Sequence, residues 1–210
     1  APEVARYSGA VPPPLLAQLQ SAFGARAPFW AETGYAQRGY FSFWQPLKEA
    51  DARAFRAGDA QASNAIEALA AHLLPLTGCA ARVVGCEWWV HTKAPSRALG
   101  NMHGHQMHFD TEEGLLYMPR PEVAHPAVSS VLYLSGAAAA GPTVVLDQRY
   151  TDTAPAALAH VSHPADGHVL LFPGDRLHGV CPCGGAPPAS GSDGDGADGR
   201  PGAGSEAGAG

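Results

Sequence analysis

The sequence predicts an α+β fold in which an N-terminal helical layer covers a jelly-roll core. Two segments before residue 80 have apolar residues at helical spacing. After residue 80 the chain changes to short β-rich runs separated by glycine, proline and aspartate, which is typical of a sandwich or barrel. We therefore expect a helical support layer over residues 1–79, a β-rich core over 80–183 and a disordered tail over 184–210.

The expected helical layer begins after an extended lead that ends in a run of prolines. Residues 15–23 then read as a short amphipathic helix. A second helix is expected over residues 59–74, where four aliphatic side chains form one stripe. Asp59 or Ser63 would cap its N-terminus, and Gly78 would end it.

Aromatic side chains are concentrated between the two expected helices, over residues 28–46. A packing layer over the sheet is one interpretation of this stretch, because large rings dominate the energetics of protein cores. A platform that binds a substrate is the alternative.

About seven β-rich runs follow, each four to twelve residues long, with turn residues between them. A loop is expected over residues 136–142, because this alanine-rich stretch lies between two runs and ends in Gly-Pro. The tail has no aromatic, valine, isoleucine or leucine residue, so it cannot bury apolar area. The expected strands are 81–92, 106–110, 127–135, 143–146, 158–162, 168–172 and 176–181.

Composition excludes several classes of protein. The net charge of −6 gives no electrostatic footprint for nucleic acid. No apolar run approaches the ~20 residues that a membrane-spanning helix needs, and no signal peptide is visible. The cysteines are too few for a disulfide scaffold, so we expect free thiols in a soluble, intracellular protein. They are Cys79, Cys86, Cys181 and Cys183.

The segment 101–113 holds three histidines and an aspartate close together. His108 and Asp110 are two residues apart, so in a β-strand both side chains project from the same face. The best candidate for a third ligand is His178, which follows the β-rich run 168–172. Two histidines and one carboxylate on one face of a metal ion leave the opposite positions open, as in non-haem Fe(II) oxygenases.

Three motifs extend this pattern: His-Phe-Asp-Thr-Glu at 108–112, Ser-Ser-Val-Leu-Tyr-Leu at 129–134 and Gly-Pro-Thr-Val-Val at 141–145. With them, roughly residues 85–183 resemble the 2-oxoglutarate- and Fe(II)-dependent oxygenases. The resemblance implies a double-stranded β-helix with His108, Asp110 and His178 as the iron ligands. It also implies that an acceptor is hydroxylated with O₂ while 2-oxoglutarate is decarboxylated to succinate, with ascorbate as a reductant. A protein side chain and a small metabolite both remain open as the acceptor.

One expected residue of that family is absent from its usual place. An arginine or lysine about ten residues after the last histidine ligand would pair with the distal carboxylate of 2-oxoglutarate. Here that position falls near Pro188, within the expected disordered tail. Three explanations are open: the strand lies beyond residue 210, the tail interrupts it, or the domain has lost the cosubstrate anchor. The candidate substitutes are Tyr133, Arg176 and Lys93.

Two other functions stay open at this stage. His103 and His105 also form a His-x-His motif, and with His178 they would give a cupin-type metal site. A non-catalytic binding module would keep the fold and lose the cosubstrate anchor. In either case the ligands need hydrogen-bonded partners to orient them, and the nearest candidates in the sequence are Gln106, Thr111 and Glu112.

Overall fold

The computed structural model describes residues 3–34, 42–91, 105–112, 115, 118–120, 122–136 and 141–181. Within these residues, helices combine with three antiparallel sheets, which confirms the mixed helical and β-rich composition. The jelly-roll topology stays a prediction. The tail over 184–210 lies outside the described residues, as do Lys93, His103 and Cys183.

Most of the described helices come early in the chain and most of the described strands come late. The helices are α1 (Pro13–Phe23), α2 (Pro28–Thr33), α3 (Glu49–Ala57), α4 (Ala65–Leu73), η1 (Leu74–Thr77) and η2 (Ala80–Arg82). The strands are β1 (Ala5–Tyr7), β2 (Phe43–Pro46), β3 (Gly85–Trp88), β4 (His105–His108), β5 (Ser129–Leu132), β6 (Thr143–Arg149), β7 (Ala159–Ser162), β8 (Val169–Phe172) and β9 (Arg176–Val180).

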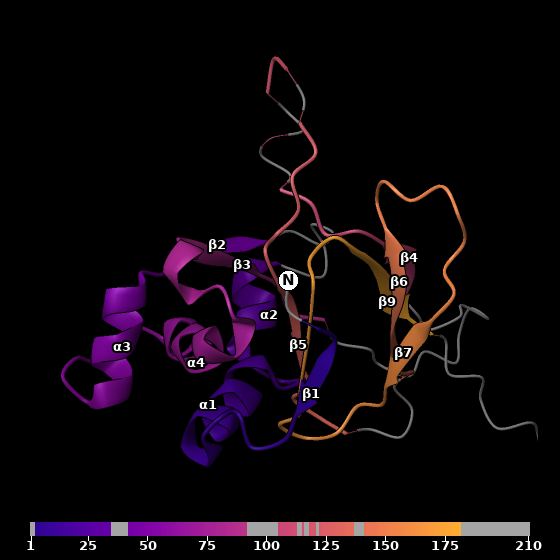
Figure 1. Cartoon of the computed structure of the whole chain (residues 1–210). Coiled ribbons are helices and arrows are strands. Elements are labelled where there is room, and N and C mark those ends of the chain that lie inside the picture. Colours follow the sequence, from indigo (N-terminus) through magenta and orange to yellow (C-terminus); the bar gives the residue numbers. More distant parts are fainter. Residues whose placement is uncertain are drawn as a thin grey trace, which may run out of the picture.

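The strands form sheets in the orders β1-β8-β5, β2-β3 and β4-β9-β6-β7. Figure 1 shows the α-helices on one side, the four-stranded sheet on the other, and β1 and β5 between them. The expected extended lead therefore includes a strand, because residues 5–7 pair with β8. Three layers result, with the β1-β8-β5 sheet in the middle.

The middle layer is buried on both faces, as the sequence of its central strand β8 shows. Its sequence Val-Leu-Leu-Phe is apolar throughout, and all four residues are buried. Side chains alternate between the faces of a strand. Val169 and Leu171 pack with α1 and α4, whereas Leu170 and Phe172 pack with Val145 of β6 in the opposite sheet. The second of these cores lies directly beneath the site described below.

The second predicted helix differs from the prediction at its start. Residues 59–64 precede α4, and Asn64 caps it by accepting hydrogen bonds from the backbone N–H groups of Ile66 and Glu67 at 2.9 Å. The predicted caps Asp59 and Ser63 were therefore wrong. Ser63 instead donates its N–H and hydroxyl to the Glu67 carboxylate.

The end of this helix agrees with the prediction in part. Helix α4 ends at Leu73, the chain continues as η1, and Gly78 follows with a φ of 67°. The left-handed backbone at Gly78 explains why glycine stops the helical path there.

The aromatic stretch contributes to packing where the structure describes it. Phe29 and Phe43 lie against Trp88, with ring centroids 6.4 and 4.6 Å away, and Phe23 of α1 lies 5.8 Å from the same ring. The rings thus join α1 and α2 to the β2-β3 sheet. Tyr35, Tyr40 and Phe41 lie outside the described residues.

Two further expectations bear on the protein's surroundings. Within the described residues, Cys79, Cys86 and Cys181 are free thiols. Burial raises the pKa of Cys86 to about 11, so its thiol stays protonated at neutral pH. None of the described helices has the length and apolar character that crossing a bilayer requires.

Candidate metal centre

Two of the three predicted ligands lie opposite each other on paired strands. His108 is the last residue of β4, and its register partner on β9 is His178. The ring centroids of the two histidines are 4.3 Å apart. Asp110 was predicted to lie in the same strand as His108, but β4 ends two residues earlier. The aspartate therefore reaches the site from the loop that follows the strand.

The structure brings all three side chains together in a group that could hold a metal ion, with their ligand atoms within 4.8 Å of one another. Asp110 Oδ1 lies 3.5 Å from His108 Nε2 and 3.6 Å from His178 Nε2. Two ligands that are each about 2.1 Å from an ion are about 3 Å apart at a right angle and at most ~4.2 Å apart. Both distances fall in this range.

Backbone carbonyl groups fix which nitrogen of each ring faces the site. The Nδ1 atom of His108 lies 2.8 Å from the carbonyl oxygen of Gln106, and that of His178 lies 2.9 Å from the carbonyl oxygen of Arg176. A carbonyl oxygen can only accept, so Nδ1 carries the proton and donates. In each neutral ring the lone pair is then on Nε2, which is the atom that faces Asp110.

The charges of the group suit a cation. Burial opposes ionisation of Asp110, but its hydrogen bond with His108 and the attraction of both rings lower the pKa of the carboxyl below its usual value. The interaction with Asp110 raises the pKa of His108, whereas burial lowers the pKa of His178. The carboxylate is therefore ionised at neutral pH and the deeper imidazole is neutral, as a metal ligand must be.

The three side chains differ in their access to solvent. The side chain of His178 is 8% exposed and its ring lies 4.7 Å from that of Phe172, whereas the His108 side chain is 35% exposed. The site is thus closed beneath His178 by the inter-sheet core and open beside His108. A small molecule would approach from the His108 side.

The pKa directions predict how metal affinity changes with pH. Around pH 6.5 His108 binds a proton because its pKa is raised, while His178 stays neutral and Asp110 stays ionised. One proton then competes with the metal, so the apparent affinity for Co²⁺ should fall about tenfold per pH unit below the His108 pKa. Titrations of Co²⁺ between pH 7.5 and about 6 would measure this slope. A hundredfold fall per unit would contradict the assignment, because both rings would then be titrating together.

Asp110 has partners that the sequence did not indicate. Ser129, the first residue of β5, donates its hydroxyl to Asp110 Oδ2 at 2.5 Å. His125 Nδ1 donates to the backbone carbonyl of Asp110 at 2.7 Å. Gln106, one of the expected partners, orients His108 through its backbone oxygen. Neither Thr111 nor Glu112 has a side-chain hydrogen bond to the three ligands among the contacts of the described residues.

The predicted cosubstrate residues take up different positions. Arg176 lies two residues before His178 on β9, donates from Nη1 to the carbonyl oxygen of Asp147, and has a buried Nε without a hydrogen bond. Tyr133 is buried between the two sheets, where its hydroxyl donates to the carbonyl oxygen of Ser162 at 3.2 Å. Lys93 lies outside the described residues, and no side-chain position is described for His105.

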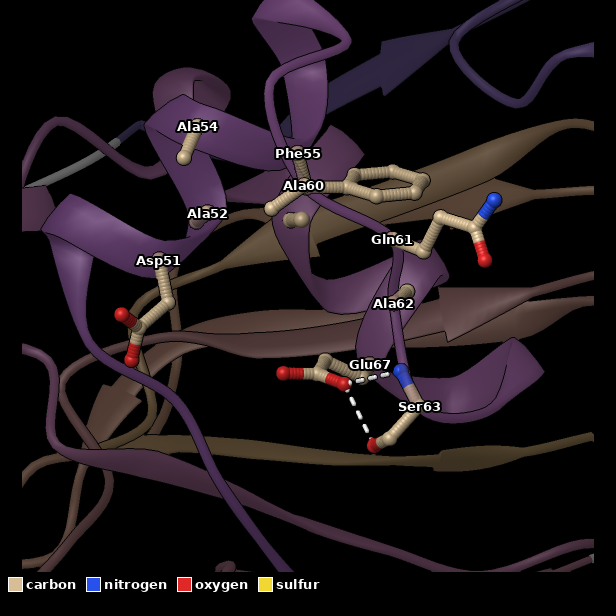
Figure 2. Close-up of a pocket in the computed structure, with 10 residues that line it drawn as sticks. Asp51, Ala52, Ala54, Phe55, Ala60, Gln61, Ala62, Ser63 and Glu67 are labelled. Carbon is tan, nitrogen blue, oxygen red and sulfur yellow. Dashed lines mark hydrogen bonds between the residues drawn. The ribbon is translucent and has the colours of Figure 1, made fainter.

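A hollow of about 280 Å³ between α3 and α4 is separate from this group (Figure 2). Half of its lining residues are alanine, and the Glu67 carboxylate at its edge accepts hydrogen bonds from Ser63. It includes none of the three predicted ligands. Among the described residues, the group that could hold a metal ion is His108, Asp110 and His178.

No protein-family model, curated protein or solved structure matches the chain. What can be said of this site therefore rests on the residues themselves and on their geometry.

Proposed function

We propose that the protein is an oxygenase that uses Fe(II) and 2-oxoglutarate to hydroxylate an acceptor. The observation that carries the proposal is the convergence of two histidine Nε2 atoms and one carboxylate oxygen from separated parts of the chain. Neutral imidazole with carboxylate is a donor set that suits Fe(II). Three protein ligands on one side leave the other positions for a keto acid and O₂.

The strand pairing supports a jelly-roll arrangement for this core. β4 pairs with β9, β5 with β8, and β6 with β7, so the pairs are nested around the β6–β7 connection. β5 and β8 lie in one sheet and the other four strands lie in the second. A long double strand that is rolled over itself would give this pattern. The additional β6–β9 pairing joins the β4-β9 and β6-β7 pairs into one four-stranded sheet. A double-stranded β-helix is therefore the fold that we propose.

Arg176 is the described residue best suited to bind the distal carboxylate of 2-oxoglutarate. Successive residues on one face of a strand are about 6.6 Å apart, which is close to the length of the keto acid. The buried Nε of Arg176 has no hydrogen bond, and the Asp175 carboxylate lies 3.9 Å from it, so this N–H could still donate to a closer carboxylate. Tyr133 fits less well, because its hydroxyl would have to leave the carbonyl of Ser162.

The proposed roles follow from these positions. When bound, Fe(II) with 2-oxoglutarate and O₂ supplies hydroxylation of the acceptor together with conversion of the keto acid to succinate and CO₂. His108, Asp110 and His178 would hold the ion, Arg176 would orient the keto acid, and Phe172 would exclude water beneath His178. The exposed side of His108 would admit the acceptor.

Succinate release tests this proposal directly. The purified protein should convert 2-oxoglutarate to succinate when Fe(II), ascorbate and O₂ are added, and His108→Ala should lower the rate at least a hundredfold, a loss of about 3 kcal/mol. His160→Ala is the matched control, because this histidine is exposed on β7 and takes no part in the site. Equal succinate output from the wild type and His108→Ala would remove the proposal.

The two alternatives give different results with the same variants. A cupin-type site would keep its metal affinity in His108→Ala and lose it in His105→Ala. A non-catalytic module would bind metal through His108, Asp110 and His178, yet calorimetry would detect no binding of 2-oxoglutarate to the metal-loaded protein.

A further inference from the structure

The carboxylate ligand is the one member of the site that no strand holds in place. His108 and His178 are fixed by β4 and β9, whereas Asp110 lies beyond the end of β4. An aspartate carboxylate has several rotamers available to it and can bind a metal through one oxygen or two. Something other than the strand must therefore select its orientation.

The segment 124–129 supplies three hydrogen bonds to this loop. The carbonyl oxygen of Ala124 accepts from the N–H of Glu112 at 2.9 Å. His125 donates to the carbonyl oxygen of Asp110, and Ser129 donates to its Oδ2. The backbone that follows the Asp110 side chain and one of its two carboxylate oxygens are thus bound to the same short segment.

This segment is itself fixed within the fold. Ser129 is 6% exposed and begins β5, where it pairs with Phe172 of β8. Pro126 lies against Gly174 in the turn between β8 and β9, so closely that a β-carbon on Gly174 would overlap the Pro126 carbonyl. The segment is thus attached to β8 and to the turn that leads from β8 into β9, the strand of His178.

We propose that Ser129 is a positioning residue that presents Asp110 to the metal through Oδ1 alone, with His125 as its backbone support. The hydroxyl of Ser129 occupies Oδ2, and Oδ1 is the oxygen that faces both imidazoles. A carboxylate that binds through one oxygen leaves one more position open at the ion. This inference rests on the proposed metal centre and adds the residue that sets its coordination number.

Co²⁺ is the probe for this inference, because its visible absorption depends on coordination number and its binding needs no turnover. Ser129→Ala should weaken Co²⁺ binding about 10- to 100-fold and change the absorption spectrum, because Asp110 can then rotate and bind through both oxygens. Ser129→Thr retains the hydroxyl and should restore the wild-type spectrum. Ser130→Ala is the matched control, since Ser130 is the next residue of β5 and is exposed.

A double-variant cycle separates positioning from general damage to the fold. In an Asp110→Ala background, Ser129→Ala should cause no further loss of Co²⁺ affinity, because its effect acts through that carboxylate. Equal losses in both backgrounds, or an unchanged affinity and spectrum in Ser129→Ala, would overturn the positioning role and leave the metal centre intact.

Two other outcomes are also decisive. If Ser129→Ala does not fold, His125→Ala is the second variant, with an expected loss of Co²⁺ affinity of about tenfold, at the lower end of the Ser129→Ala range because the contact to Oδ2 remains. A wild-type affinity in His125→Ala would then count against the inference. No binding of Co²⁺ by the wild type would overturn the metal centre itself, together with everything that rests on it.

Discussion

Replacement of His178 by alanine should lower the affinity for Co²⁺ or Zn²⁺ by about a thousandfold, or ~4 kcal/mol. His178 is the most buried of the three ligands, and its Nε2 is aimed at the site by the carbonyl of Arg176. Alanine would leave only His108 and Asp110, which lie at the exposed side. Competition with a chromophoric chelator measures the affinity, and circular dichroism checks that the variant is folded.

The control for this prediction is His160→Ala, which removes an exposed histidine from the same sheet. It should bind metal as tightly as the wild type. If His178→Ala kept an affinity within threefold of the wild-type value, a difference of about 0.6 kcal/mol, the three residues would not form the metal site.

Replacement of Phe172 by alanine should cost about 3–5 kcal/mol of unfolding free energy. Its ring is 1% exposed, and it packs with Val145, Leu170 and Tyr133 between the two sheets. Removing it leaves a cavity that the surrounding side chains cannot fill without moving. Urea unfolding followed by circular dichroism measures the loss in metal-free protein.

Val161→Ala is the comparison, because Val161 is 56% exposed on β7 and its truncation should change stability by less than about 0.5 kcal/mol. Since Phe172 also contacts the ring of His178, Phe172→Ala should weaken metal binding as well. A loss of stability below about 1 kcal/mol would mean that the core between the sheets is less tightly packed than its burial indicates.

The strands of the core were predictable because each apolar run is bounded by turn residues. All seven expected runs contain a strand, from β3 to β9, with the ends shifted by a few residues. The two short N-terminal strands were missed for a physical reason. Ala5–Tyr7 and Phe43–Pro46 have no alternating pattern of their own, and they are strands because β8 and β3 pair with them.

Helix α3 was missed because it buries little. Ala52 is its one buried residue and Phe55 is half-buried against the core, so few apolar side chains mark the segment as a helix in the sequence. The α4 start was placed too early because Asp59 and Ser63 are also good capping residues by type. Asn64 is the residue that caps α4 because the chain, after the left-handed Gly58 that ends α3, enters the helical conformation only at Ala65.

The three candidate metal ligands could be predicted from the sequence, whereas the residues that hydrogen-bond to Asp110 could not. Spacing and motif place His108 and Asp110 together, and the expected strand 176–181, which the structure shows as β9, supplies His178. Ser129 and His125 gave no local signal, because their contact with Asp110 spans 19 and 15 residues and exists only after β5 has paired with β8. Local sequence instead suggested Thr111 and Glu112, which are adjacent along the chain.

The position of β4 gives the ion a mechanical role as well. Among the described strands, β4 is at the edge of its sheet and has β9 as its one partner, with an irregular register between His105 and His108. A bound ion would cross-link this edge strand to its neighbour β9 and close a loop of chain from residue 108 to residue 178. By the chain-entropy estimate for a permanent link across such a span, the tether would be worth up to about 4 kcal/mol. Peeling of β4 away from the sheet should therefore be the first motion that chelation of the metal releases.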